Sequence, residues 1–225
     1  MRRFRIAVAL SVLALSGLAW RAYAAPGAYP NGTSVVETLH NLSFAASSNL
    51  YGAGALRDYG EVCVYCHTPH GGQTSAPLWN RNFSTATYQM YDANHSSTIN
   101  MTVDPQPTGV SQACLSCHDG TVGLDVIVNV PNNYTGGAAV GTRMPAGGLT
   151  NLGTDLRNDH PISILFDNTA DNKFHTSSEI QAAGLQLYNG KVQCGSCHNP
   201  HTAANRPFLR ISNSASALCL TCHIK

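Results

Sequence analysis

One five-residue pattern, Cys-x-x-Cys-His, occurs four times in the chain and accounts for all eight cysteines. Two cysteines three residues apart lie on one helical turn, where both thiols can bond one haem and the next histidine can reach its iron. Zinc ribbons and disulfides also use paired cysteines, but neither explains a histidine directly after every pair. The pattern therefore predicts four covalently attached haem c groups. The attachment cysteines are Cys63, Cys66, Cys114, Cys117, Cys194, Cys197, Cys219 and Cys222, and the proximal iron ligands are His67, His118, His198 and His223.

The N-terminal segment has the three parts of a secretory signal peptide. Arg2, Arg3 and Arg5 precede an apolar run over residues 6–19, and the small-x-small sequence of residues 22–24 follows. The apolar run is shorter than the roughly 20 residues that span a bilayer. We therefore expect residues 1–24 to be removed, no membrane anchor, and an exported product that is extracellular or on the cell surface, with the periplasm as the alternative.

The charge of the expected product argues against a nucleic-acid partner. The chain has 13 Lys+Arg and 12 Asp+Glu, and removal of the four arginines in residues 1–24 leaves 9 basic residues against 12 acidic ones. The haem propionates add further negative charge. Proteins that bind nucleic acids normally present a basic surface, so we expect no nucleic-acid partner.

An internal repeat organises the chain into two halves. Each half has a site of the form C-x-x-C-H-x-P-H followed by one of the form C-L-[ST]-C-H, and no proline-rich or charged linker separates them. Long apolar-periodic segments are scarce. We therefore predict one tetrahaem domain over residues 25–225, mostly irregular coil with short helices and a few short strands wrapped around a stacked haem array, a multihaem cytochrome c fold.

Four segments carry local signals. Asn189-Gly190 between residues 185–188 and 191–193 predicts a hairpin with a type I′ turn. The β-branched residues of 121–130 predict a strand. Residues 212–218 predict a short helix with hydroxyl caps, and residues 131–156, rich in Gly, Asn and Thr, predict an ordered surface loop.

Up to four further iron ligands are needed, and six other histidines are available. His70 and His201 each lie three residues after a proximal histidine, so they share its side of the macrocycle and must reach a different iron or none. Pro161 biases His160 toward an extended backbone that presents its ring. His40 lies on an N-terminal arm and can ligate within the chain or in a neighbouring subunit.

The remaining candidates for iron ligation are weaker. His95 and His175 lie in polar surroundings with no repeat behind them, and we expect both to be spare and exposed. Methionine opposite histidine is the other possibility, and it raises the reduction potential. Because enough histidines are present, we expect histidine rather than Met90, Met101 or Met144.

Three segments of the sequence together resemble one known group of proteins. These are Cys63-Val-Tyr-Cys-His-Thr-Pro-His-Gly-Gly with Pro77-Leu-Trp-Asn-Arg, Cys114-Leu-Ser-Cys-His-Asp-Gly-Thr-Val-Gly, and Asp159-His-Pro-Ile. They are similar to the doubled-CxxCH multihaem cytochromes of metal-respiring bacteria, above all the filament-forming tetrahaem type of the outer surface. The resemblance implies bis-histidine haems stacked in one line, with a histidine from one subunit on a haem of the next. It makes His40, His70, His160 and His201 the distal set and His40 the expected ligand in trans.

Three functions are compatible with these observations. An electron carrier needs both axial positions of each iron filled, whereas a haem enzyme needs one open. Four motifs with four well-placed further histidines favour a non-enzymatic role, namely extracellular electron transfer as a subunit of a homopolymeric filament. Other cytochromes or metal oxides are then the expected redox partners. A monomeric periplasmic carrier and a multihaem oxyanion reductase are the alternatives.

Overall fold

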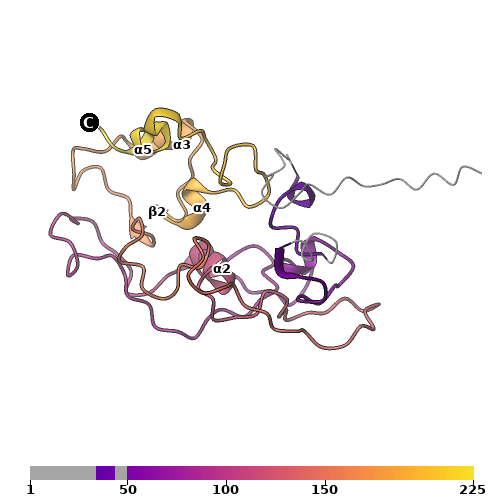
Figure 1. The fold of residues 1–225 in the computed structure, drawn as a ribbon. Coiled ribbons are helices and arrows are strands. Elements are labelled where there is room, and N and C mark those ends of the chain that lie inside the picture. The colour runs from indigo at the N-terminus through magenta and orange to yellow at the C-terminus, as the bar shows by residue number, and fades with distance from the viewer. Residues whose placement is uncertain (1–33, 44–49) are drawn as a thin grey trace, which may run out of the picture.

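The structure is a computed structural model that describes residues 34–43 and 50–225. The expected signal peptide therefore lies outside the described residues. Regular elements are short and widely spaced along the chain (Figure 1). In chain order they are η1 (Val35–Glu37), η2 (Cys63–Tyr65), α2 (Gly109–His118), β1 (Ile164–Leu165), α3 (Ser177–Ala182), β2 (Lys191–Val192), α4 (Cys194–Cys197), η3 (Ser214–Ser216) and α5 (Ala217–Cys222).

The described part of the chain is mostly coil, with short helices and one two-stranded antiparallel sheet. This agrees with the expected fold class as far as secondary structure is concerned. One helix lies at each CxxCH motif: η2 starts at Cys63, α2 ends at His118, α4 runs from Cys194 to Cys197 and α5 ends at Cys222. In Figure 1, α4 lies beside α2, and α3 lies beside α5.

The hairpin turn is confirmed, but its strand pairs elsewhere. Asn189 and Gly190 both have positive φ, 51° and 75°, as a type I′ turn requires. Tyr188 and Lys191 exchange two backbone hydrogen bonds of 2.9 and 3.0 Å across it. β2 itself pairs with β1 in the register Ile164↔Val192 and Leu165↔Lys191, whereas residues 185–187 on the other side of the turn form no strand.

The strand predicted over residues 121–130 is wrong, since this segment has turns and bends only. Several of its backbone groups bind Arg81 and Asn80 instead of a neighbouring strand, and the Val128 N–H donates to the main-chain carbonyl of Asn80. Arg81 donates to the carbonyls of Gly123 and Leu124 at 2.6 and 2.8 Å, and Asn80 binds the backbone at Val128 and Asn129. β-propensity without a partner edge does not produce a strand.

Two further local predictions are met in part. Residues 131–156 contain no helix or strand, as expected for a loop. The helix expected over residues 212–218 is present as η3 and α5, but no side-chain hydroxyl caps the start of either helix. The residue before α5, Ser216, has a left-handed backbone with φ 64°. The helix α3 was not predicted. Thr176 and Glu179 form a capping box at the start of α3, and the Thr-x-x-Glu pattern could have revealed it.

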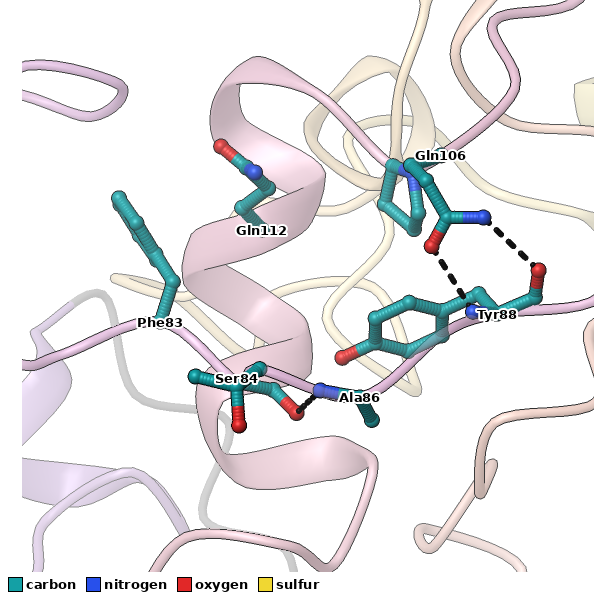
Figure 2. A pocket seen from close by; sticks show the side chains of 8 residues that line it. Phe83, Ser84, Ala86, Tyr88, Gln106 and Gln112 are labelled. Atoms are coloured by element: carbon teal, nitrogen blue, oxygen red, sulfur yellow. Dashed lines mark hydrogen bonds between the residues drawn. The ribbon is translucent and has the colours of Figure 1, made fainter.

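The buried apolar residues form two small clusters. One contains Tyr59, Tyr65 and Leu124, and the other contains Tyr88 and Leu115. Beside the second cluster, the Gln106 amide imitates a strand partner: it accepts from the backbone N–H of Tyr88 at 2.8 Å and donates to its carbonyl at 3.0 Å (Figure 2). The Gln106 side chain thus makes the two hydrogen bonds to Tyr88 that a neighbouring strand would otherwise make.

Candidate haem-binding site

The four motifs share one local geometry in which the cysteines lie on a single helical turn. The His198 N–H donates to the Cys194 carbonyl at 3.0 Å, and the His223 N–H donates to the Cys219 carbonyl at 2.9 Å. All eight cysteines are free of disulfides. Among the described residues, no three Cys, His, Asp or Glu side chains gather as a structural zinc site requires.

Three of the proximal histidines are oriented by backbone carbonyls. The Nδ1 atoms of His67, His118 and His198 lie 2.9, 2.7 and 3.0 Å from the carbonyl oxygens of Pro77, Thr150 and Pro207 respectively. A carbonyl can only accept, so Nδ1 carries the proton and the lone pair is on Nε2. This is the tautomer and the supporting contact that a metal-binding histidine needs.

Two of the expected distal histidines have the same support. Nδ1 of His40 lies 3.2 Å from the Pro200 carbonyl oxygen, and Nδ1 of His160 lies 2.9 Å from that of Pro161. Burial, and then the neighbouring His118, lower the pKa of His40 to about 4. His40 is therefore neutral at physiological pH, as a ligand must be.

Three of the expected distal histidines lie next to three proximal ones. The ring centroids of His40 and His118 are 6.1 Å apart, those of His67 and His201 6.0 Å, and those of His160 and His223 6.4 Å. Imidazole nitrogens bond a metal at about 2.0–2.1 Å and half a ring adds about 1.1 Å, so two rings on one ion have centroids about 6.3 Å apart. Each observed pair has the separation that one shared iron requires.

The His201 ring thus lies near the histidine of the first motif, whereas His201 itself follows the third motif. His70 is exposed and has no ring contact with another histidine within the described residues. The described part of the chain likewise places no second ring at this spacing from His198. His95 is exposed and its ring packs on Tyr91. His175 is only partly exposed: its ring lies 3.9 Å from Glu179, and its backbone N–H donates to the Cys222 carbonyl of the fourth motif at 2.9 Å.

One motif opens onto a cavity suited to a macrocycle. The cavity measures about 340 Å³, within the range of small-molecule and cofactor sites. Both thiols of the fourth motif, His223 and His160 line it together with apolar side chains that include Ile164, Phe166, Phe174, Ile180 and Leu218. A covalently attached haem needs two thiols for its vinyl groups, imidazoles for its iron and apolar side chains around its ring. These residues supply all three, so they fit the group.

Burial raises the pKa of two of the motif thiols. Burial, and then Cys117, raise the pKa of the Cys66 thiol to about 12. Burial raises the pKa of Cys222 to about 11. Reactive cysteines have lowered pKa values and polar surroundings, whereas these remain protonated in the unmodified chain.

Motifs that are neighbours in the sequence are also in contact in space. Cys66 and Cys117, of the first and second motifs, pack on one apolar cluster. The second and third motifs meet where the Ser111 hydroxyl accepts from the Cys194 N–H at 3.0 Å. Cys197 of the third motif lines the same cavity as the fourth.

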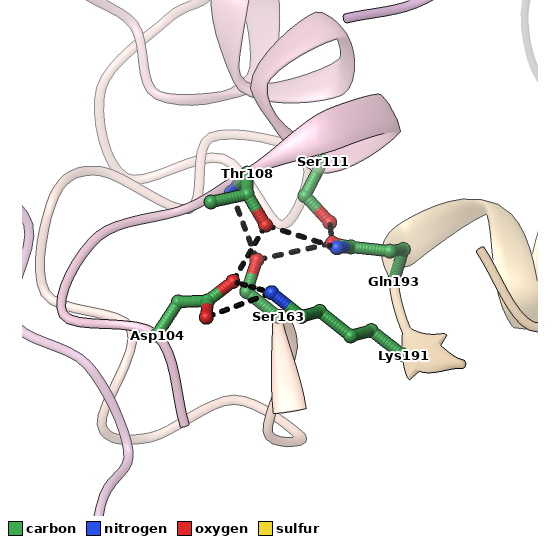
Figure 3. A network of polar contacts seen from close by, with 6 residues as sticks. All are labelled: Asp104, Thr108, Ser111, Ser163, Lys191 and Gln193. Carbon is green, nitrogen blue, oxygen red and sulfur yellow. Dashed lines mark hydrogen bonds and ion pairs between the residues drawn. The ribbon is translucent and has the colours of Figure 1, made fainter. Parts of the chain in front are cut away.

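A buried polar network joins the second motif to the third (Figure 3). Gln193 accepts from the hydroxyls of Ser111 and Ser163, and its amide nitrogen donates to Thr108. Asp104 extends the network to Lys191 with contacts of 2.7 and 2.8 Å. Because Ser111 lies in α2 and Gln193 directly precedes α4, this network holds the two attachment helices together.

A comparison with protein families supports the interpretation of the CxxCH motifs. A family model described as the doubled CXXCH motif matches residues 188–225, which contain the third and fourth motifs. No curated protein matches the chain. In the described residues, none of the helices has the length and apolar character needed to cross a membrane. The doubled motif indicates covalent haem c binding and supports a multihaem c-type cytochrome.

Proposed function

We propose that this protein is an exported electron carrier with four bis-histidine c-type haems, and that it acts as a subunit of an extracellular filament. The observation that carries the proposal is the placement of three further histidines opposite three proximal ones at 6.0–6.4 Å. Such a pair leaves no open position for a substrate, which suits a carrier rather than an enzyme. Covalently bound haem supplies one-electron transfer.

The residues of the chain serve this role by holding rigid ligands close together. Backbone carbonyls set the rings of His67, His118 and His198, so these rings need not move when an electron arrives or leaves. Neighbouring motifs share an apolar cluster, the Ser111 contact and one cavity. The shared contacts support a continuous series of sites across the subunit, suited to relaying electrons to another cytochrome or a metal oxide.

The proposal is tested by EPR spectroscopy of the haem-loaded protein with and without cyanide. We expect only low-spin iron and no cyanide binding in the assembled form. The ring planes are near perpendicular for His40/His118 and His160/His223, at 88° and 74°, and near parallel for His67/His201, at 16°. The low-spin signal should therefore contain at least two distinguishable classes.

One observation favours a second candidate, because His198 has no opposed ring within the described part of its own subunit. An iron held there by His198 alone would be open, as in an oxyanion reductase. A cyanide-binding, high-spin iron in the assembled protein would support the reductase and refute the carrier.

A further inference from the structure

We infer that the buried Arg81 gives the haems at the first and second motifs a higher reduction potential than the haem at the fourth motif. The inference rests on the proposed function and adds an order in which the haems accept electrons. Three observations carry it: the burial of the Arg81 charge, its position between the first two motifs, and an acidic rather than a basic side chain at the fourth.

Arg81 carries a buried positive charge that no carboxylate neutralises. Its side chain is 0% exposed, and an arginine in a protein stays protonated. Its guanidinium donates to the carbonyls of Gly123 and Leu124 at 2.6 and 2.8 Å, and to the carbonyl and hydroxyl of Ser116 at 3.2 and 3.3 Å. Within the described residues no Asp or Glu forms an ion pair with it, and the Asp125 carboxylate accepts from three backbone N–H groups instead. Neutral dipoles therefore hold the charge without cancelling it.

Both of the first two motifs contact the Arg81 segment. Ser116, which takes two of the guanidinium bonds, lies between the two cysteines of the second motif. The backbone N–H of residue 80 donates to the Cys66 carbonyl of the first motif at 2.8 Å. Cys66 and Cys117 pack on the cluster that contains Leu124, whose carbonyl Arg81 binds. Arg81 thus lies between the first and second attachment sites.

Two thiols of these motifs respond to the Arg81 charge. Burial, and then Cys117, raise the pKa of Cys66, and Arg81 opposes them. Burial also raises the pKa of Cys117, where Arg81 opposes this rise more strongly than the nearby Asp119 adds to it. The net field of the charged side chains at these two thiols is therefore positive, in agreement with the position of Arg81.

The fourth site has the opposite charge beside it. Asp171 lines the cavity of the fourth motif, and no Lys or Arg of the described residues does so. Lys173 and Lys225 are close in sequence to this site but are exposed, so water and salt screen their charges. At the third motif, Arg210 donates to the Gly195 carbonyl at 2.7 Å but is only partly buried. We therefore expect the fourth haem to have a lower potential than the first and second, with the third between them.

The sign of the effect follows from the charge that an electron brings. Each reduction adds one electron, and so one negative charge, to a site, and Arg81 neither gains nor loses a proton. A fixed cation beside the site favours the reduced state and raises the potential, whereas a carboxylate favours the oxidised state. The influence is largest where the charge is buried, because the effective dielectric constant is low there and salt does not screen it. Electrons from a redox partner should accordingly rest on the first two haems before the fourth.

The test is a reductive titration of the haem-loaded protein with dithionite, followed by EPR. The near-parallel signal, from His67/His201, reports the first haem, and the near-perpendicular signal, from His40/His118 and His160/His223, reports the second and fourth. In wild type we expect the near-perpendicular signal to disappear in at least two steps, because only one of its two sites adjoins Arg81.

Three variants separate the charge of Arg81 from its hydrogen bonds. Arg81→Gln removes the charge and should lower the reduction constant of the first haem and of the higher near-perpendicular step by about tenfold, or about 59 mV for one electron, without moving the lower step. Arg81→Lys keeps the charge and should leave both within about twofold of wild type. Arg157→Gln removes the same charge from a surface pair with Asp155, and should change none of the steps.

A second measurement uses wild-type protein alone, so it does not depend on the folding of an Arg81 variant. Raising the salt concentration from about 0.01 M to about 1 M shortens the Debye length from about 30 Å to about 3 Å. A buried charge is screened little by salt, so the gap between the first haem and the lower near-perpendicular step should persist across this range. A gap that closes with salt would assign it to surface charges and overturn the inference.

The outcomes separate this inference from the proposed function. Unchanged potentials in Arg81→Gln would overturn the inference, and low-spin iron in the same samples would leave the carrier intact. Equal losses in Arg81→Gln and Arg81→Lys would also overturn it, since the hydrogen bonds rather than the charge would then set the potentials. High-spin, cyanide-binding iron in the assembled wild-type protein would refute the carrier itself, whatever the order of the potentials.

Discussion

Asp125 offers a sharp test of how a chain with so little regular structure is held together. Its carboxylate is fully buried and accepts three backbone N–H bonds, from Arg57 at 2.8 Å, Val140 at 2.6 Å and Gly141 at 2.9 Å. These contacts tie two separate segments, at residue 57 and at residues 140–141, to the segment of Asp125, which adjoins the cluster on which Cys66 and Cys117 pack. Asp125→Asn keeps the shape of the side chain but replaces one acceptor oxygen with a donor.

The expected loss follows from the three contacts. If the amide oxygen faces Arg57 and Val140, the Gly141 N–H is left against an NH₂ group, and an unsatisfied buried group costs about 1–3 kcal/mol. The other two bonds weaken from the charged class, about 1.5–3 kcal/mol, to the neutral class, about 0.5–1.5 kcal/mol. Asp125→Asn should therefore lower the free energy of unfolding by about 3–5 kcal/mol, a large part of a typical domain's stability.

Guanidinium unfolding of the haem-loaded protein, followed by circular dichroism and extrapolated to water, measures this loss. Asp58→Asn is the matched control, because Asp58 is exposed and accepts one local bond from Gly60. We expect the control to change stability by less than about 0.5 kcal/mol. A loss below about 1 kcal/mol for Asp125→Asn would show that the carboxylate does not hold these segments together.

Three other substitutions test neighbouring parts of the structure. Burial opposes ionisation of Asp104, but hydrogen bonds from Lys191 and Thr108 outweigh it and lower its pKa, so the contribution is present above about pH 4 and is lost as pH falls through the folded value. The gap in unfolding free energy between wild type and Asp104→Asn should accordingly shrink as denaturant titrations move from pH 6 to about pH 3. Ser111→Ala removes the hydroxyl between α2 and α4 and should cost about 1–3 kcal/mol in the same assay, with four haems still counted by mass spectrometry; fewer haems would assign Ser111 a role in attachment. A Cβ on Gly72 would lie 2.7 Å from the Leu78 carbonyl carbon, so Gly72→Ala should lower the melting temperature, whereas Gly148→Ala, whose nearest neighbour is 3.5 Å away, should not.

Local features of the fold were predictable where a short pattern determines the backbone. The Asn189-Gly190 turn is such a case, since both residues tolerate positive φ. The strand expected over residues 121–130 failed because strand formation depends on a partner edge. Here the side chains of Arg81 and Asn80, which are distant in the sequence, bind the backbone of residues 121–130 in place of a partner strand. A capping box of two nearby residues was readable at α3 and was overlooked.

The sequence alone determined the chemistry of the attachment sites. A thiol pair and its histidine lie within five residues, and one helical turn brings them together whatever the rest of the chain does. It also supplied the candidate distal histidines, because their residue type and offset are visible without coordinates. Only the tertiary structure decided which of them faces which motif. The rings of His40 and His118 lie close together, as do those of His201 and His67, although each pair is far apart in the sequence. Their positions depend on long-range contacts such as His40 with the Pro200 carbonyl and Ser111 with Gln193. No local pattern encodes such contacts.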